Sequence, residues 1–317
     1  MAKVKMIIDC DTGVDDALAI SYILANPDIE FLGISTTFGN VSVDQSVKNS
    51  LLLLEMFHRE DVKVYRGSEH NWKSDSYYRD PRLDDIHGRN GIGNVDLGEP
   101  KGKAQDISAV DFIVDCARKY GEDLHVVFVG PLTNFGECVR KDPEAMKQIN
   151  ITIMGGALTV QGNRDIYSEA NIFDDPVAAK YVFGSDAHIS VVPLDVTLKT
   201  LFKVGDIREW KEINDAGKNL YEIARFYYVN EYQDEETGGA MHDPLAAFAS
   251  YDPSIITNWF RCNLTVEENG RMIGTFQELN LEEKRHCVAL DVDAKRFTET
   301  YIELVTRMIK DLNTVSE

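Results

Sequence analysis

The sequence lacks the features of a membrane protein, a secreted protein or a chain of several linked domains. No apolar run reaches membrane-spanning length, and residues 1–5 contain no signal-peptide core. No Pro-, Gly- or Ser-rich linker, low-complexity tract or internal repeat divides the 317 residues. We therefore expect a single domain over residues 1–317, a cytoplasmic location and no membrane partner.

Basic residues are scarce as well. The chain has 33 Lys and Arg against 53 Asp and Glu, which gives a formal net charge of -20. A surface of this sign repels nucleic acid and anionic membranes, so the expected partner is a small molecule. The five cysteines are odd in number and widely spaced, which indicates reduced thiols in the core and not a disulfide framework.

Four aspartates crowd into eight residues directly behind the apolar run at residues 4–8. They are Asp9, Asp11, Asp15 and Asp16. We expect residues 4–8 to form a buried strand, Gly13 to provide a turn and a helix to begin at Asp15. The carboxyl ends of strands in open α/β sheets bind ligands. An acidic helix start explains one or two aspartates and leaves the others repelling each other, so the cluster predicts a hard cation such as Ca²⁺ or Mg²⁺.

Strand-like and helix-like segments alternate along most of the chain. This pattern predicts an α/β fold with an open, mostly parallel sheet flanked by helices, similar to the Rossmann fold. Strands are expected at residues 4–9, 31–37, 62–65, 124–129, 150–154, 188–192 and 287–292, and helices at 15–24, 42–57, 106–120, 175–183, 207–232 and 294–312. Near the C-terminus, the runs 261–266 and 272–277 flank Asn269-Gly270, which predicts a β-hairpin.

Further segments place polar side chains next to the ends of these strands. They are residues 36–40, 86–93, 127–134, 155–176 and 241–247. His242 precedes Asp243-Pro244, and histidine is the side chain best suited to move protons near neutral pH. Taken singly, each segment also fits an ordinary turn or helix cap.

Taken together, these segments resemble the family of inosine-uridine-preferring nucleoside hydrolases. The resemblance runs from Ile8 to the helix after His242, and its core is the run DCDTGVDDA at residues 9–17. It implies the open α/β fold, a bound Ca²⁺ and hydrolysis of the N-glycosidic bond of ribonucleosides to ribose and free base, in purine and pyrimidine salvage. It also implies a homo-oligomer, either a dimer or a tetramer.

The resemblance further implies roles for individual residues. Asp11 would be the metal-bound general base, His242 an acid for the leaving base, and Asn40 would lie beside the attacking water. The implied metal ligands are Asp11, Asp16, Asp243 and the backbone carbonyl of Val129. The implied substrate contacts are Asp15 and Asn171 at the 2′- and 3′-hydroxyls, Asn163 and Glu169 at the 5′-hydroxyl, Met154 beneath the ribose and His87 near the base.

The nucleobase pocket is the part where the resemblance is loosest. Arg89, Asn90, Met241 and the segment 226–232 are candidates for contacts to the base, and they leave the choice between purine and pyrimidine open.

Two other interpretations remain at this stage. A haloacid-dehalogenase-type phosphatase also begins with a strand and Asp-x-Asp and binds Mg²⁺, with Asp9 as the nucleophile and Asp11 as the acid/base. The later Lys and acidic-pair motif of those enzymes is not found in this sequence. The third interpretation is a non-catalytic module that binds a nucleoside or Ca²⁺.

Overall fold

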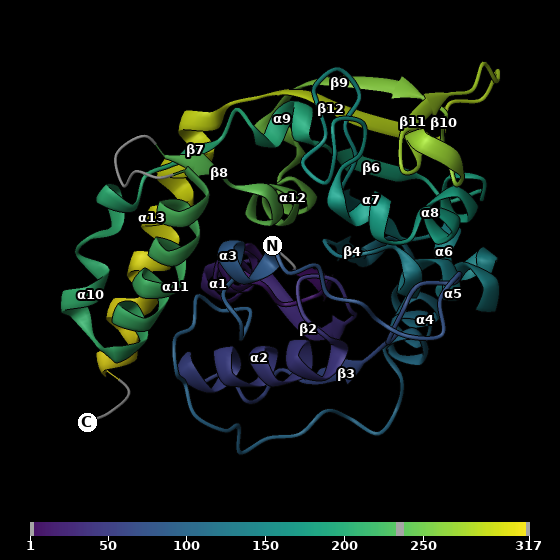
Figure 1. The fold of residues 1–317 in the computed structure, drawn as a ribbon. Helices are drawn as coiled ribbons and strands as arrows, with labels where there is room; N and C mark the ends of the chain where they lie inside the picture. Colours follow the sequence, from purple (N-terminus) through teal and green to yellow (C-terminus); the bar gives the residue numbers. More distant parts are fainter. Residues whose placement is uncertain (1–2, 233–237, 315–317) are drawn as a thin grey trace.

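A central sheet of eight strands organises the molecule (Figure 1). The structure is a computed structural model that describes residues 3–232 and 238–314, without the side chains of Glu231, Tyr232 and Thr314. The strand order is β3-β2-β1-β4-β5-β6-β12-β9, and every neighbouring pair is parallel except β12 with β9. The bounds are β1 Val4–Cys10, β2 Ile29–Thr36, β3 Val64–Arg66, β4 Leu124–Phe128, β5 Asn150–Met154, β6 Ile189–Val192, β9 Ile256–Cys262 and β12 His286–Val292.

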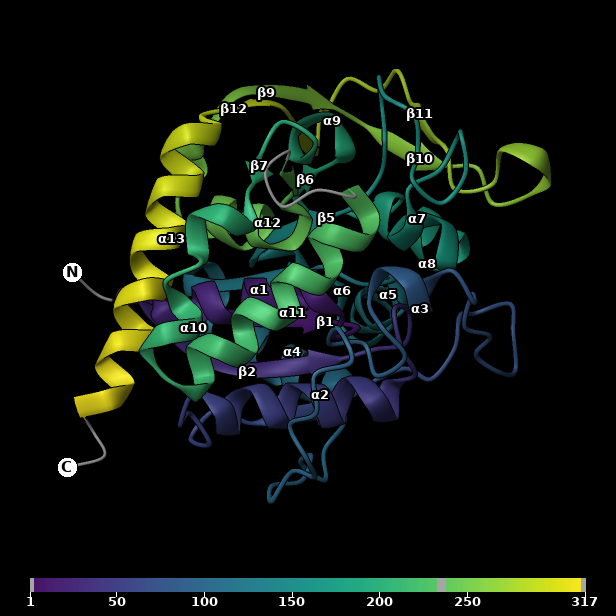
Figure 2. The same cartoon turned by 60° about the vertical axis from the view of Figure 1, so that its left-hand side comes forward.

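Helices cover both faces of this sheet. One hydrophobic cluster includes residues of α1, α2, α11, α12 and α13, and a second cluster includes residues of α4, α5 and α8. Figures 1 and 2 show α11 and α13 side by side on the outer side of the helices that form the first cluster. The bounds are α1 Val14–Ala25, α2 Val43–Met56, α3 Leu83–Ile86, α4 Ala109–Tyr120, α5 Thr133–Lys141, α6 Pro143–Lys147, α7 Ala170–Asp174, α8 Pro176–Phe183, α9 Leu194–Thr197, α10 Trp210–Ile213, α11 Asp215–Tyr232, α12 His242–Tyr251 and α13 Ala294–Asp311.

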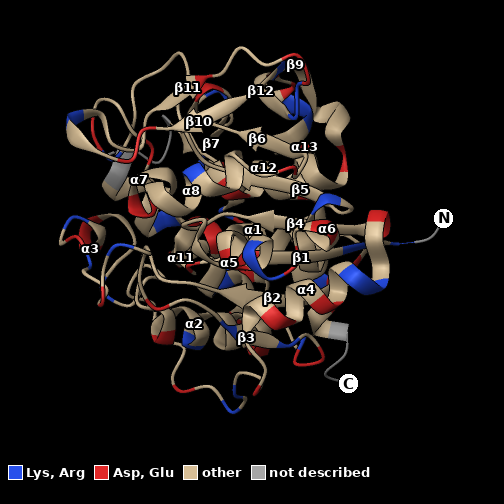
Figure 3. Ribbon diagram, turned by 90° about the vertical axis from the view of Figure 1, so that its right-hand side faces the viewer, with Lys and Arg blue, Asp and Glu red and all other residues tan. Residues whose placement is uncertain are grey.

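The strands are apolar on both faces because both faces are covered. In β1, Met6 and Ile8 belong to the first cluster and Ile7 to the second, as the alternation of side chains along a strand requires. Charged residues lie mostly on the helices and loops around the sheet (Figure 3). None of the described helices combines the length and the apolar character that a bilayer crossing requires.

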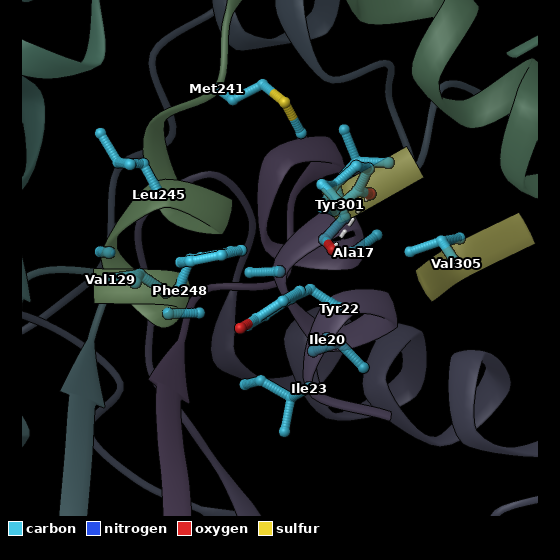
Figure 4. Packing of buried hydrophobic residues seen from close by; sticks show 14 of the residues in the cluster. Ala17, Ile20, Tyr22, Ile23, Val129, Met241, Leu245, Phe248, Tyr301 and Val305 are labelled. Carbon is cyan, nitrogen blue, oxygen red and sulfur yellow. Dashed lines mark hydrogen bonds between the residues drawn. The ribbon is translucent and has the colours of Figure 1, made fainter. Parts of the chain in front are cut away.

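The packing of α12 on α1 is the part of the core that positions the site. The ring of Tyr22 in α1 stacks on Phe248 in α12 with centroids 5.1 Å apart, and Tyr301 of α13 lies 6.4 Å from Tyr22 (Figure 4). This contact fixes the two helices relative to each other. Their first turns carry Asp15 and Asp16 on α1, and His242 and Asp243 on α12.

This architecture confirms the predicted α/β fold with an open, mostly parallel sheet and an antiparallel hairpin near the C-terminus. The hairpin strands are shorter than expected, β10 being Leu264–Val266 and β11 Phe276–Glu278. Residues 261–262 belong to β9 instead, because they pair with β12. The helix expected from residue 106 begins at Ala109, since the Ser108 hydroxyl caps it by accepting from the Asp111 N–H. The helix expected over 207–232 is interrupted at Asn214.

Candidate active site

A cavity of about 300 Å³ opens at the carboxyl ends of the parallel strands. Its position is the one where open α/β sheets bind ligands, next to the point where the strand order reverses between β1 and β4. All of the predicted site residues except Asp16 line this cavity. They are Asp11, Asp15, Asn40, His87, Val129, Met154, Asn163, Glu169, Asn171, His242 and Asp243.

Buried carboxylates converge on the floor of the cavity. One oxygen from each of Asp15, Asp16 and Asp243 lies within 4.8 Å of the others. Burial raises the pKa of Asp15 to about 8 and that of Asp16 to about 6, and it raises the pKa of Asp243 well above its usual range. The sequence predicted Asp11 as a ligand beside Asp16 and Asp243, and assigned Asp15 to the ribose. In the structure, Asp15 is the third member of this group of three carboxylates, and Asp11 is not.

The donor set on this floor fits a hard cation. The Oδ1 atoms of Asp11 and Asp15 are buried and have no hydrogen-bond partner among the described residues. A buried carboxylate oxygen without a partner costs free energy unless it binds a proton or a cation. Clustered carboxylate oxygens are the ligands that Ca²⁺ and Mg²⁺ take, whereas zinc sites usually include histidine or cysteine.

Backbone N–H groups fix the orientation of Asp16. Its Oδ2 accepts from the N–H of Gly13 at 2.7 Å, and its Oδ1 accepts from the N–H of Asp11 at 3.2 Å. The side-chain amide of Asn40 also donates to Oδ2 at 3.1 Å. Asp16 is the third residue of α1, and its side chain reaches back to the N–H of the cap residue Gly13, so a residue of the first helical turn also organises the aspartate loop.

Asn40 holds Asp11 as well. Its backbone N–H donates to Asp11 Oδ2 at 2.5 Å, and Oδ1 is the oxygen of that carboxylate for which residues 3–232 and 238–314 provide no hydrogen-bond partner. The turn before Asn40 needs Gly39, because φ is +150° and a Cβ there would collide with the Asp11 carboxylate.

The predicted sugar contacts other than Asp15 lie at the end of β5, between that strand and α7, or in α7 itself, where Asn171 is the second residue of the helix. Asn171 donates its side-chain N–H to the Val129 carbonyl at 2.9 Å and to the Met154 carbonyl at 3.2 Å, so its Oδ1 is left to accept from a ligand. Glu169 caps α7 and accepts backbone N–H bonds from Asn171, Ile172 and Gly156.

Asn163 is exposed at the outer part of the cavity. Its Oδ1 accepts from the Ala170 N–H at 3.0 Å. This bond ties the loop that carries Asn163 to the start of α7, so both predicted contacts to the 5′-hydroxyl belong to one connected segment.

Two buried histidines line the same cavity. The Nδ1 of His87 accepts from the N–H of Val14 at 3.2 Å, and its ring lies 5.5 Å from that of Tyr227. The Nδ1 of His242 lies 2.8 Å from the hydroxyl of Thr197. Burial lowers the pKa of His87 to about 3 and that of His242 to about 4, so both rings are neutral at neutral pH.

A cover loop, residues 77–88, closes one side of the cavity. The Tyr77 hydroxyl donates to the Gly39 carbonyl at 2.6 Å. Arg79 donates to the Asn40 carbonyl at 2.7 Å and to the Gly88 carbonyl at 2.9 Å, and it also pairs with Asp84. The cover loop is therefore attached to the same turn that holds Asp11.

Ion pairs cross the mouth of the cavity. Asp80 in the cover loop accepts from Arg164 at 2.6 Å and from Arg82 at 2.8 Å. Arg164 also lies 3.9 Å from Asp174. These contacts join the cover loop to the loop that carries Asn163.

Sequence reasoning missed several residues that line the cavity. They are Gly39, Tyr78, Asp80, Arg82, Leu83, Ile86, Arg164, Ala170, Asp174 and Leu198. Of the segment 226–232, only Tyr227 is among the lining residues whose side chains are described. Gly39, Ile86, Arg164, Ala170 and Asp174 lie within segments that the sequence singled out, but no role was assigned to them. The other five lie outside those segments, and no hydrophobic period selects them.

Comparison with known proteins decides the family. A family model described as inosine-uridine preferring nucleoside hydrolase matches residues 6–299. The chain belongs to this family. It is therefore an N-glycosyl hydrolase, in agreement with the prediction from sequence.

Individual relatives of this nucleoside hydrolase carry different substrate names. Probable uridine nucleosidase 2 of Arabidopsis thaliana is 36% identical over 260 residues, which cover 80% of this chain and 79% of that protein. The pyrimidine-specific ribonucleoside hydrolase RihA of Klebsiella pneumoniae (strain 342) is 31% identical over 93% of this chain and 96% of its own length. The structure named purine-preferring ribonucleoside hydrolase from Gardnerella vaginalis has a TM-score of 0.92, with 40% identity, 96% of this chain covered and 99% of that one.

Membership in the nucleoside hydrolase family excludes the phosphatase interpretation. The position of Asp9 supports the same conclusion. Asp9 is fully buried behind Asp11, bonds to the Ser35 hydroxyl and to Asn134 at 2.7 Å, and does not line the cavity. A nucleophile would have to reach a substrate, which this carboxylate cannot do. Membership in a family of enzymes also argues against the non-catalytic interpretation.

Three of the candidates for contacts to the base do not line the cavity. Met241 is fully buried in the core, and Arg89 and Asn90 are not among the lining residues. The Oδ1 of Asn90 accepts from the N–H groups of Ile92 and Asn94, so this side chain shapes its own loop. The side chains of Glu231 and Tyr232 lie outside the described residues.

Proposed function

We propose that this nucleoside hydrolase uses Ca²⁺ to cleave ribonucleosides into ribose and free base, in nucleoside salvage. One observation carries the proposal: carboxylates from segments more than two hundred residues apart meet on the floor of one cavity, and two of their buried oxygens have no hydrogen-bond partner in the described part of the chain. The carboxylates of Asp11, Asp16 and Asp243 and the carbonyl of Val129 would hold the ion, with Asp15 beside them. Bound there, Ca²⁺ would supply positive charge that favours ionisation of a water and grips the ribose diol.

Asp11 is the residue best placed to accept a proton. Because Asn40 occupies its Oδ2, its Oδ1 is the atom that is left to receive the proton of an attacking water. A base held in one orientation is effective because the reacting atoms are already aligned. Asn40 has a second part in this proposal, since its side chain lies beside the path of that water and bonds to Asp16.

The sugar is bound by groups that can accept from hydroxyls. We assign the 2′- and 3′-hydroxyls to Asp15 and to Oδ1 of Asn171, and the 5′-hydroxyl to Asn163 and Glu169. Met154 lies beneath the ribose, where its Sδ contacts the amide of Asn171 at 3.4 Å. Cleavage of the N-glycosidic bond builds positive charge on the ribosyl ring, and the surrounding carboxylates stabilise that charge.

The base end of the cavity contains His242, His87 and Tyr227. We assign the neutral ring of His242 as a hydrogen-bond donor to the departing base and His87 as a contact to the base. The substrate names of the relatives include uridine, pyrimidine and purine, so the proposal covers both kinds of ribonucleoside.

One experiment tests this proposal. The purified protein is incubated with uridine, inosine and p-nitrophenyl phosphate, its metal content is measured by elemental analysis, and free base and phosphate are quantified. We expect base from at least one nucleoside, no phosphate, and about one calcium per chain. Release of phosphate alone, or stoichiometric zinc in place of calcium, contradicts the proposal.

The sugar assignment has its own test. Uridine and 2′-deoxyuridine differ by one hydroxyl, and each buried partner left without it costs roughly 1–3 kcal/mol. We expect kcat/KM for 2′-deoxyuridine to fall by at least about tenfold. Equal kcat/KM for the two substrates contradicts the diol assignment.

Three wider expectations belong to the same proposal. They are a single domain, a homo-oligomer of two or four copies, and a cytoplasmic location. Light scattering on the purified protein measures the number of copies, and limited proteolysis tests for a single domain because linkers between domains are cut first.

A further inference from the structure

The hydroxyl of Thr197 is buried and contacts His242, the proposed hydrogen-bond donor to the departing base. It is the last residue of α9, is fully buried and does not line the cavity. Its Oγ1 lies 2.8 Å from the Nδ1 of His242. The backbone of α9 fixes this position, because the Thr197 N–H donates to the Pro193 carbonyl at 3.1 Å.

The hydrogen-bonding capacity of the two groups selects one direction for this contact. Among the described residues, the His242 ring is the one hydrogen-bond partner of Thr197 Oγ1. If Nδ1 of His242 donated, the hydroxyl hydrogen of Thr197 would be buried without an acceptor. If Thr197 donates to Nδ1, that hydrogen is used, and leaving it unused is the costlier arrangement.

A hydroxyl that donates to Nδ1 places the imidazole proton on Nε2. Since Thr197 occupies Nδ1, Nε2 is the nitrogen of His242 that remains for a ligand in the cavity. His87 provides an internal comparison. The N–H of Val14 can only donate, so Nδ1 of His87 is an acceptor and its proton also lies on Nε2.

We propose that Thr197 is a positioning residue that holds His242 in the neutral tautomer with the proton on Nε2, from which the ring donates a hydrogen bond to the departing nucleobase. This inference rests on the proposed function, because it acts through the role assigned to His242. The opposite tautomer would present a lone pair to a base that gains negative charge as the glycosidic bond breaks. That arrangement would oppose departure of the base, and the Thr197 hydroxyl prevents it.

Kinetics with two kinds of leaving group test this inference. Thr197→Val keeps the shape of the side chain and removes the hydroxyl. We expect kcat for uridine or inosine to fall by roughly 3- to 10-fold, which corresponds to the loss of one neutral hydrogen bond. The rate with p-nitrophenyl riboside should stay unchanged, because p-nitrophenolate leaves without a proton donor. Thr197→Ser, which restores a hydroxyl, should recover the nucleoside rate.

Two controls separate positioning from a general structural effect. Thr200→Val removes another buried hydroxyl from the same turn, one that donates to the Thr197 carbonyl at 2.7 Å, and it should affect both substrate types alike. In a His242→Ala background, Thr197→Val should cause no further loss of nucleoside hydrolysis. Equal slowing of both substrates by Thr197→Val, or a further loss in that background, overturns the inference.

The tautomer is also measurable without any activity. In ¹⁵N-histidine spectra of the wild-type protein, the resonances lost in His242→Ala identify this ring among the seven histidines. We expect the proton of His242 on Nε2, and a proton on Nδ1 overturns the inference even if Thr197→Val does not fold. If no base is released from any nucleoside, the proposed function fails. If His242→Ala slows nucleosides but not p-nitrophenyl riboside, and Thr197→Val does not show this difference, only the role of Thr197 fails.

Discussion

The floor and the cover of the cavity are built in different ways. On the floor, Asp11 and Asp16 follow a central strand, are buried, and are oriented by backbone N–H groups. The cover consists of the cover loop and of the loop that carries Asn163. Its residues Asp80 and Arg164 come from these two loops and are held together by an ion pair near solvent. Such exposed pairs contribute little free energy, whereas a displaced buried group costs several times more. The proposed chemistry thus belongs to the part held by buried hydrogen bonds, and substrate enclosure to the part held by weaker ion pairs.

The two sides meet at Asn40. Its N–H and side-chain amide bond to the aspartates of the floor, and its carbonyl accepts from Arg79 of the cover loop. One residue therefore carries both the orientation of the proposed base and the attachment of the cover loop. If the comparison holds, changes on the floor should act on kcat, and changes on the cover should act mainly on KM.

The largest effect is expected for Asp11→Asn. The amide keeps the shape of the side chain and removes its capacity to accept a proton, so kcat should fall by roughly 10³-fold or more. Because the attacking water must be activated whichever group leaves, uridine and p-nitrophenyl riboside should lose activity alike. Elemental analysis of the same variant serves as the control for metal binding. A rate within tenfold of wild type, with calcium retained, would remove Asp11 from this role.

His242→Ala is expected to have the next largest effect, and only on one kind of substrate. Nucleosides should be hydrolysed roughly 10²- to 10³-fold more slowly, the usual loss when one hydrogen-bond donor to developing negative charge is removed, while p-nitrophenyl riboside is spared. If both substrates slow alike with metal still bound, His242 positions the site and the donor is another group, with His87 next to be tested.

The floor should also make stability depend on metal and pH together. Burial raises the pKa values of Asp15 and Asp16 to about 8 and about 6, above the unfolded value of 3.8, so the metal-free folded state binds more protons than the unfolded state. Stability of the metal-free protein is then greatest below the unfolded value and falls as pH rises through the folded values. We expect Tm after chelation to drop between pH 5 and 8, and calcium to raise Tm most at pH 8. A constant difference in Tm across this range contradicts the argument.

The difference between floor and cover also explains what the sequence could predict. Asp11 and Asp16 could be placed because an apolar strand, a glycine turn and an acidic helix start follow one another locally. Asp243 and the sugar contacts needed the resemblance to a family, since nothing local links residue 243 to residue 16. Tyr78, Arg82 and Arg164 could not be predicted, because loops have no hydrophobic period and long-range ion pairs leave no local pattern.

A smaller effect is expected where the cover loop is attached. Arg79→Gln should remove the paired contacts to the Asn40 and Gly88 carbonyls and raise KM by roughly 10-fold, with a smaller change in kcat. Arg79→Lys can keep one of the two bonds but not the fork of a guanidinium, so it should fall between Arg79→Gln and wild type. Arg66→Gln is the matched control, because Arg66 pairs with Asp44 and Glu69 away from the cavity. A loss confined to kcat would mean that Arg79 acts on the floor alone.

The smallest effect is expected at the mouth, for Asp80→Asn. Its partners Arg164 and Arg82 are partly exposed, and an exposed ion pair contributes only about 0–1 kcal/mol, so kcat/KM should change by less than roughly fivefold. Salt screens such pairs, and the difference between variant and wild type should shrink as the ionic strength rises from about 0.01 to 1 M. Arg164→Gln should give a change of the same size, and the double variant should lose less than the two single losses added together, because both substitutions remove the contact between Asp80 and Arg164. A large, salt-independent loss in either variant would place this ion pair in contact with the substrate and would weaken the distinction between a chemical floor and an enclosing cover.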